Sequence, residues 1–256
     1  MKYTLLFLDT ETTGNTPTDR LCQLCYRTWI NGTLSSELNE LYLPPREISI
    51  GSMAIHHITP KMVADKPGFQ ESSQYPEIKS LLESPNSIMI AHNAPFDAAV
   101  MALEGIFPPN LIDTLKLVRH SDPDMAIERH NLQFLRYYWM LDDNLPPGTV
   151  INPHDALSDV IILEQIFWHL FKVLKDTNKF TDDDAILEYM IKRSAEPATI
   201  GTFTFGKHMG KRVVDVAQTD PSYLNWLLGQ KREQAANGEN EDDWIYTLER
   251  ALGITR

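Results

Sequence analysis

Apolar residues in the first fifth of the chain form short, continuous runs that predict strands rather than helices. Tyr3–Leu8 is aromatic, β-branched and aliphatic without alternation, which is typical of a strand buried on both faces. A loop at Thr12–Pro17 ends it. Leu21–Ile30 predicts a second strand, and the Asn31-Gly32 dipeptide after it favours a two-residue hairpin turn. With a third strand over Leu38–Leu43, the pattern predicts an antiparallel meander.

From there the pattern alternates between short strands and helices. Ser87–Ala91 and Leu111–Asp113 read as buried strands. Helical periodicity covers Phe96–Gly105, Asn131–Trp139 and a long segment that begins at Asn152-Pro153 and runs to about Lys175. A meander followed by alternating helices and strands predicts an α/β fold, with a mixed five-stranded sheet flanked by helices.

A polar stretch, Asp176–Thr181, predicts a boundary between a domain over 1–176 and a small α+β domain over 177–256. The elements predicted for the smaller domain are a helix that starts near Asp182, a β-hairpin of Thr202–Phe205 with Lys211–Val216, a short helix from Asp220-Pro221 and a last helix over Asp242–Leu252.

Composition narrows the class of protein. With 43% hydrophobic and 23% charged residues the chain is globular, and 35 acidic against 23 basic residues give a net charge of −12. This balance argues against a protein held to nucleic acid by bulk positive charge, but it permits an enzyme whose acids hold cations that meet phosphate. Two cysteines, Cys22 and Cys25, exclude a disulfide scaffold and predict buried thiols in a reducing cytoplasm. The early apolar run is too short to cross a membrane.

The first strand carries a pair of acids two residues apart. Residues i and i+2 of a strand share a face, so the carboxylates of Asp9 and Glu11 point the same way and repel each other. A divalent cation such as Mg²⁺ or Mn²⁺ would remove that repulsion. The alternative is a pair of ordinary acids at an exposed strand end.

Two further segments place acids beside strand ends. His92–Asp97 follows a buried strand and puts Asp97 in the first turn of a helix. His154–Asp159 opens the long helix, where Asp159 faces the sheet and His154 stays near the loop. Asp155 points elsewhere and favours the helix dipole.

Together, Asp9–Gly14 (DTETTG), His92–Asp97 (HNAPFD) and His154–Asp159 (HDALSD) resemble the DEDDh family of 3′–5′ exonucleases. The resemblance implies a ribonuclease H-like fold. It implies two metal ions, Mg²⁺ or Mn²⁺, held by Asp9, Glu11, Asp97 and Asp159, with His154 as general base. It also implies release of nucleoside 5′-monophosphates from DNA 3′ ends, single-stranded or frayed, with a role in DNA repair.

The same resemblance implies substrate contacts from Thr12, Ala54, His56, Asn93 and Phe96. The alternative for His56 is a residue that caps a loop and meets no ligand. Asn15 departs from the family, since members often carry an apolar residue there against the terminal bases, and this puts the opening of duplex ends in doubt.

The C-terminal segments Thr202–Lys211 and Asp220–Leu227 resemble the bacterial exodeoxyribonuclease X group of that family. Basic residues stand here among aromatic ones, which suits an accessory surface for single-stranded nucleic acid. The alternative is that the aromatic residues form the core of the small domain. The residues concerned are Lys207, Lys211, Arg212, Phe203, Phe205, Tyr223 and Trp226.

Three other functions remain open from the sequence. An exonuclease that trims RNA 3′ ends would use the same five residues, and a proofreading partner of a polymerase would share them too. An inactive nucleic-acid-binding module would lack at least one of the five, and all five are present. The sequence does not predict strand preference or oligomeric state.

Overall fold

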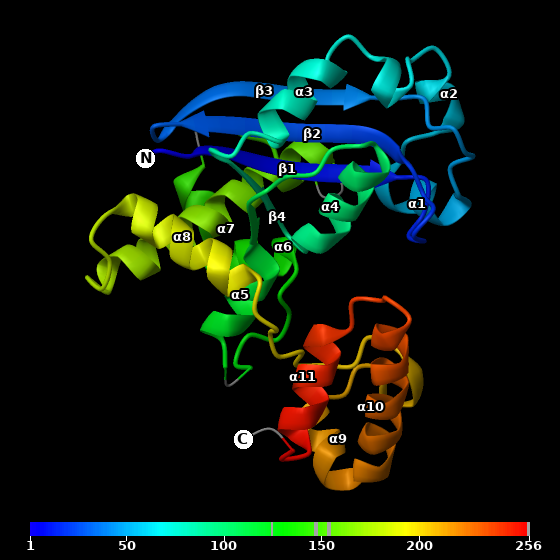
Figure 1. Ribbon diagram of the computed structural model, residues 1–256, viewed down its shortest axis with the longest axis vertical. Helices are drawn as coiled ribbons and strands as arrows, with labels where there is room; N and C mark the ends of the chain where they lie inside the picture. The colour runs from blue at the N-terminus through cyan, green and yellow to red at the C-terminus, as the bar shows by residue number, and fades with distance from the viewer. Residues whose placement is uncertain (124, 146–147, 153–154, 255–256) are drawn as a thin grey trace. The chain divides into compact units, whose positions relative to one another are not determined.

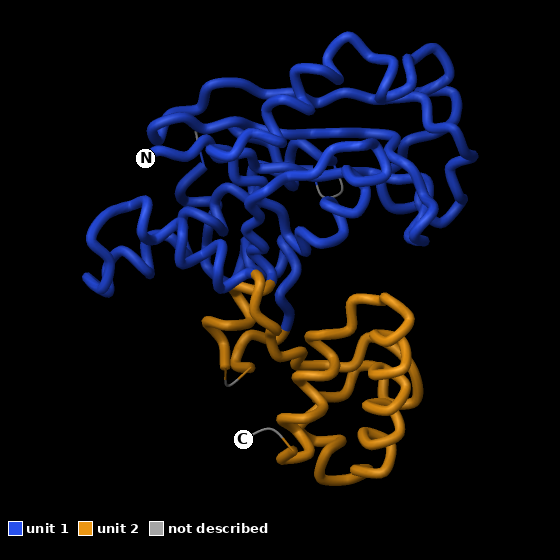
Figure 2. The backbone as a smooth tube through the Cα atoms, in the orientation of Figure 1, with its two compact units in different colours: residues 1–115, 129–194 blue, residues 116–128, 195–256 orange. Residues whose placement is uncertain are grey.

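The computed structural model describes residues 1–123, 125–145, 148–152 and 155–254. Its chain forms two compact units, one of residues 1–115 with 129–194 and one of residues 116–128 with 195–256 (Figure 2).

The first unit is built on one five-stranded sheet in the order β3-β2-β1-β4-β5. Strands β1, β2 and β3 pair antiparallel, and β4 and β5 add to β1 in parallel. The predicted α/β class and mixed five-stranded sheet are therefore confirmed. The strands are β1 (Thr4–Thr12), β2 (Leu21–Ile30), β3 (Thr33–Leu41), β4 (Ser87–Ala91) and β5 (Leu111–Asp113).

Strand β3 starts five residues earlier than the prediction of Leu38–Leu43. Asn31 and Gly32 both have positive φ, 51° and 76°, so the hairpin closes in two residues and sets Ile30 opposite Thr33. Because β3 is an edge strand with mostly exposed side chains, its first half carries no apolar signal.

Helices cover both faces of this sheet (Figure 1). The predicted helices at Phe96–Gly105 and Asn131–Trp139 are present within two residues of their expected starts. The long helix starts at Ala156, after the cap Asp155, instead of at Asn152-Pro153; Pro153 lies outside the described residues. The helices of the first unit are α1 (Ile50–His56), α2 (Pro60–Val63), α3 (Tyr75–Leu82), α4 (Ala94–Leu103), α6 (Leu132–Tyr138), α7 (Ala156–Asp176) and α8 (Asp183–Ser194). Helix α5 (Thr114–Ser121) begins in this unit and continues into the second.

Side chains of β1 alternate between two cores. Leu6 and Leu8 belong to the cluster that includes residues of α3 and α4. Phe7 points the other way, and its ring lies 5.1 Å from that of Phe167 in α7. Because side chains of a strand alternate between its two faces, Asp9 and Glu11 point toward the α7 side, as Phe7 does. This alternation is what positions the acids of the strand.

The second unit is mainly helical, which corrects the predicted α+β hairpin. Its only β pairing among described residues is an isolated bridge between Thr202 and Arg212. Val213–Thr219 forms helix α9 instead of a strand, because Val213 and Val216, three residues apart, are both buried in the core of the unit. Helix α10 (Pro221–Ala236) has 16 residues and is longer than the short helix predicted from Asp220-Pro221, and α11 (Asp242–Ala251) follows.

The compact units divide the chain elsewhere than at the predicted boundary after residue 176. Helix α8 belongs to the first unit, with Ile186, Leu187 and Met190 buried, and residues 116–128 belong to the second. The thiols of Cys22 and Cys25 are free and buried, as predicted, and burial raises the pKa of Cys22 to about 12. No described helix has the length and apolar character that a membrane crossing requires.

Candidate active site

Strand β1 places two acids on its α7 side. Asp9 pairs with Cys25 of β2, and Glu11 pairs with Gln23. Both share the parity of Phe7, so their carboxylates point toward the side that α7 covers. Burial raises the pKa of Asp9 well above its usual value, and the charges of Asp97, Glu11 and Asp159 raise it further.

Asp97 approaches from the first turn of α4, as predicted. Its side chain is 5% exposed, and its Oδ1 accepts hydrogen bonds from the backbone N–H (3.1 Å) and the Oγ1 hydroxyl (2.7 Å) of Thr10. Burial raises the pKa of Asp97 to about 7, although these hydrogen bonds act against the rise. Thr10 therefore holds Asp97 beside Asp9 and Glu11, the two acids that flank Thr10 in the sequence.

The sharp turn from β4 into α4 depends on Asn93. Its φ is 77°, a left-handed conformation that asparagine tolerates better than most residues. Its backbone N–H donates to Asp113 Oδ1 at 3.0 Å, which ties the turn to the end of β5. This turn directs Asp97 back toward β1.

Asp159 comes from the first turn of α7. The Asp155 side chain caps this helix, because it accepts from Ser158 N at 3.1 Å and Ser158 Oγ at 2.7 Å, so it is occupied away from the cluster. Asp159 Oδ1 accepts a hydrogen bond from Gln133 Nε2 of α6 at 3.2 Å. Arg136 Nη1 in turn donates to Gln133 Oε1 at 3.2 Å. No sequence motif marks Gln133, which lies within helix α6.

Asp9, Glu11, Asp97 and Asp159 interact electrostatically although they come from three segments of the chain. Burial raises the pKa of Glu11 to about 8, and the charges of Asp159 and Asp97 contribute to that rise. A divalent cation would remove this repulsion, and carboxylate oxygens suit Mg²⁺ or Mn²⁺. Among the described residues, no three acidic, histidine or cysteine side chains already form a complete metal-holding group. The fit to a metal therefore rests on donor chemistry and on mutual repulsion.

His154, the predicted general base, lies outside the described residues. The described chain resumes at Asp155, directly before the first turn of α7 that carries Asp159.

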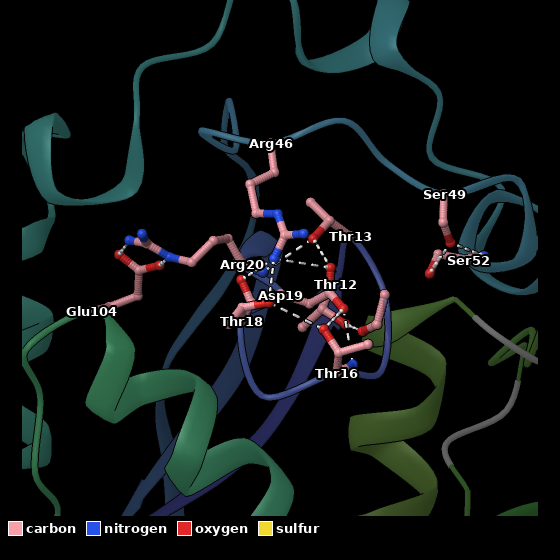
Figure 3. Close-up of polar contacts among 11 residues, drawn as sticks. Thr12, Thr13, Thr16, Thr18, Asp19, Arg20, Arg46, Ser49, Ser52 and Glu104 are labelled. Carbon is pink, nitrogen blue, oxygen red and sulfur yellow. Dashed lines mark hydrogen bonds and ion pairs between the residues drawn. The ribbon is translucent and has the colours of Figure 1, made fainter.

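A polar loop follows the acids of β1 (Figure 3). Asp19 Oδ1 accepts from Thr13 Oγ1 at 2.7 Å, and Asp19 Oδ2 accepts from Thr16 N at 2.8 Å and Thr16 Oγ1 at 2.6 Å. A Cβ at Gly14 would stand 2.4 Å from Asp19 Oδ2, so a side chain there would displace the Asp19 carboxylate from these hydrogen bonds. Asn15, which departs from the family pattern, is exposed in the same loop.

The loop is also tied to its neighbours. Arg20 makes a two-pronged ion pair with Glu104, with both N–O distances 2.9 Å, and Arg46 Nη1 donates to Thr18 O at 2.5 Å. The Ser49 N–H donates to Thr13 O at 2.9 Å. These contacts hold the backbone that follows Glu11 in one conformation.

Two of the predicted substrate contacts line a groove beside this loop. Thr12 and Phe96 lie on its walls, together with Gly14, Pro17 and Leu103. The Phe96 side chain is 38% exposed, so it is accessible to a ligand. Ala54 in α1 and Asn93 before α4 are exposed.

The structure favours the alternative for His56. This residue is 7% exposed, and its Nδ1 accepts the N–H of Ile58 at 3.0 Å. Its Nε2 therefore carries the proton and lies 3.2 Å from Thr12 O as donor. Both ring nitrogens are occupied, so His56 holds the backbone at Thr12 and has no nitrogen free for a ligand.

The sequence matches models of known protein families. A sequence model described as Exonuclease matches residues 6–167, which include all four acids. The chain belongs to the exonuclease family. A second model, described as Exodeoxyribonuclease X-like C-terminal, matches residues 203–232 of this exonuclease. The resemblance to DEDDh exonucleases of the exodeoxyribonuclease X group is thus confirmed.

Individual relatives cover most of this exonuclease. It is 33% identical over 224 residues to exodeoxyribonuclease 10 of Escherichia coli K12, across 88% of this chain and 90% of the relative. It is 26% identical to DNA polymerase III subunit epsilon of Haemophilus influenzae, across 73% and 74%. A solved structure of Exonuclease X in complex with 5′ overhanging duplex DNA matches with a TM-score of 0.57 and 28% identity, across 75% of this chain and 99% of that chain.

Proposed function

We propose that this protein is a metal-dependent 3′–5′ exodeoxyribonuclease that releases nucleoside 5′-monophosphates from DNA 3′ ends. The observation that carries the proposal is a group of four acids: burial raises the pKa of Asp9 and Glu11, and the charges of Asp97 and Asp159 raise it further. Buried acids that repel one another destabilise the fold unless a cation binds them. Acids with such raised pKa values cluster at active sites.

In this proposal the four acids hold two divalent cations, Mg²⁺ or Mn²⁺. When bound, such cations neutralise charge on a phosphodiester and lower the pKa of water. Thr10 and Gln133 orient Asp97 and Asp159 through the hydrogen bonds described above. His154 takes the proton of the attacking water, because an imidazole titrates near neutral pH.

The substrate groove supports action at chain ends. Thr12 and Phe96 line it beside the acids, and we place the terminal nucleotide there, with Asn93 and Ala54 as further contacts. A role of His56 in this pocket is indirect, through the Thr12 carbonyl that it holds.

The relatives favour DNA over RNA. The similar E. coli protein is named as an exodeoxyribonuclease, and the similar solved structure holds duplex DNA with a 5′ overhang. RNA 3′ ends are the alternative substrate. A role in DNA repair and a place in the cytoplasm stay predictions.

The test compares 5′-labelled single-stranded DNA, blunt duplex DNA and RNA of matched sequence in Mg²⁺. We expect a ladder that shortens from the 3′ end, fastest on single-stranded DNA, and none in EDTA. Asp9→Asn should abolish it, while Asp176→Asn, an exposed acid at the far end of α7, should not. Faster degradation of RNA would overturn the DNA assignment, and equal rates for Asp9→Asn and wild type would overturn the active site.

A further inference from the structure

The second unit presents basic and aromatic side chains at the edge of its core, with Trp226 exposed and Tyr223 half-buried. We infer that this surface, the aromatic–basic patch of Lys207, Met209, Lys211, Tyr223 and Trp226, binds single-stranded DNA. The inference deepens the proposed function and rests on it for the identity of the nucleic acid.

The patch is built on a closed turn that lies against α10. Backbone hydrogen bonds from Phe203 N to Lys211 O (3.0 Å) and from Gly210 N to Phe203 O (2.8 Å) close the turn. Gly206 has φ +70°, and a Cβ there would stand 2.7 Å from the Tyr223 hydroxyl. A glycine is therefore required for the turn to approach Tyr223 this closely.

The structure separates core aromatic residues from exposed ones, which the sequence left open. Phe203 is 1% exposed and stacks on Trp244, with ring centroids 5.4 Å apart, so it belongs to the core. Trp226 is 57% exposed, and its ring lies 5.5 Å from that of Tyr223. Exposed aromatic faces of this kind stack on unpaired bases with little regard to sequence.

A cation is held beside these rings. Lys207 Nζ lies 2.7 Å from Asp220 Oδ2 and 6.0 Å from the centroid of Tyr223, and its side chain is 66% exposed. Asp220 thus keeps the ammonium group next to the aromatic pair, where it can meet a phosphate. Lys211 is exposed on the same turn.

The exposed lysines of the turn favour an anionic partner. Residues 203–232 hold five basic and two acidic residues, a net charge of +3, in a chain whose net charge is −12. Lys231 and Arg232 pair with Glu241 and Glu249, so the attraction for a polyanion comes from the exposed Lys207 and Lys211. Because stacking needs bases that are not paired, single-stranded DNA fits the patch better than duplex DNA.

The experiment measures binding of the full chain to a fluorescent oligothymidylate of about 20 nucleotides, in EDTA so that no cleavage occurs. We expect Trp226→Leu to raise Kd about 5- to 100-fold and Trp226→Phe to restore most of the affinity. In a Lys207→Gln/Lys211→Gln variant, the slope of log Kd against log salt should fall by about 1.4, since each single-strand phosphate contact contributes about 0.7.

Matched controls are Phe107→Leu, an exposed aromatic of the first unit, and Lys172→Gln/Lys179→Gln, two exposed lysines there; both should leave Kd unchanged. Release of the terminal nucleotide from a trinucleotide, which offers the patch few bases and phosphates, should proceed at the wild-type rate in Trp226→Leu.

Each outcome decides a different claim. An unchanged Kd in Trp226→Leu, or equal affinity for a duplex of the same length, overturns the patch, whatever the nuclease activity. Loss of affinity in Trp226→Leu together with no nuclease activity in wild type supports the patch and overturns the proposed function.

Discussion

Thr10 stands between the two acids of β1 and points the opposite way. Its hydroxyl and its N–H both donate to Asp97, so one strand supplies two acids to the site and orients a third. Local spacing predicts that Asp9 and Glu11 share a face of the strand and that Asp97 lies in the first turn of a helix. Their assignment to one site comes from the resemblance of the motifs to DEDDh exonucleases. The contact of Gln133 with Asp159 depends on where α6 packs, and no local pattern encodes that.

Valine has nearly the shape of threonine, so its substitution at Thr10 tests whether the hydroxyl orients Asp97. Thr10→Val removes the 2.7 Å hydrogen bond to a buried carboxyl, which should cost about 1–2 kcal/mol of stability. We expect kcat on single-stranded DNA to fall roughly tenfold, as for other residues that orient metal ligands. The control Thr33→Val, at an exposed position, should change neither value. A wild-type kcat in Thr10→Val would show that Asp97 needs no such support.

At the scale of elements, burial decides what the sequence predicts. The strands Leu21–Ile30, Ser87–Ala91 and Leu111–Asp113 have the predicted bounds because they are largely buried. The exposed edge strand β3 and the short helix α9 escaped prediction, since exposure removes the apolar signal from the first and β-branched valines imitate a strand in the second. Packing of the helices against the sheet also buries charged side chains, which no pattern in the sequence predicts.

One such buried pair joins α7 to β2. Glu164 is 1% exposed and accepts from Arg27 Nη1 and Trp29 Nε1, both at 2.5 Å, while burial raises the pKa of Glu164 to about 7. Arg27→Met should destabilise the protein by about 3 kcal/mol in chemical unfolding, because it leaves a carboxyl buried without its cation. Adding Glu164→Gln should restore part of that loss. A single-variant loss below about 1 kcal/mol would count against a buried ion pair.

The cap of α10 should make the second unit sensitive to acid. Hydrogen bonds from Lys207 and His208 lower the pKa of Asp220 to about 2. A lowered carboxyl pKa stabilises the fold above the usual Asp range near pH 4, and this contribution is lost as the pH falls toward 2. The midpoint of thermal unfolding should therefore be higher for wild type than for Asp220→Asn at pH 7, and the difference should disappear near pH 2. Asp215→Asn, an exposed acid of α9, should show no such pattern; a difference for Asp220→Asn that is constant with pH would contradict the assignment.

At the scale of the whole molecule, the two compact units interleave along the chain. Polar composition after Asp176 suggested a boundary there, yet α8 packs into the first unit and Ser194 Oγ accepts the backbone N–H of Asp113 at 2.9 Å. The composition of a segment indicates whether it is exposed, but it does not indicate which unit the following helix packs against. That choice depends on the buried faces of both partners.

Truncation distinguishes the two boundaries. A chain that ends after Ser194 keeps Ile186, Leu187 and Met190 buried, and it should unfold cooperatively with nuclease activity on a trinucleotide. A chain that ends after Asp176 loses these contacts, worth roughly 2 kcal/mol each, and its melting temperature should be roughly 10 °C lower or more. Equal melting temperatures for the two chains would place the boundary after residue 176.

In the proposed function, four acids from three segments form one metal-dependent site that acts at DNA 3′ ends. The most direct measurement is single-turnover release of a 3′-labelled terminal nucleotide by wild type and by Asp9→Asn, Glu11→Gln, Asp97→Asn and Asp159→Asn. We predict that wild type releases the label as a mononucleotide in Mg²⁺ and not in EDTA, and that each variant is slower by about 10²–10³-fold. Label that appears first in longer fragments would argue against action at the 3′ end, and a variant that matches wild type would exclude that acid from the site.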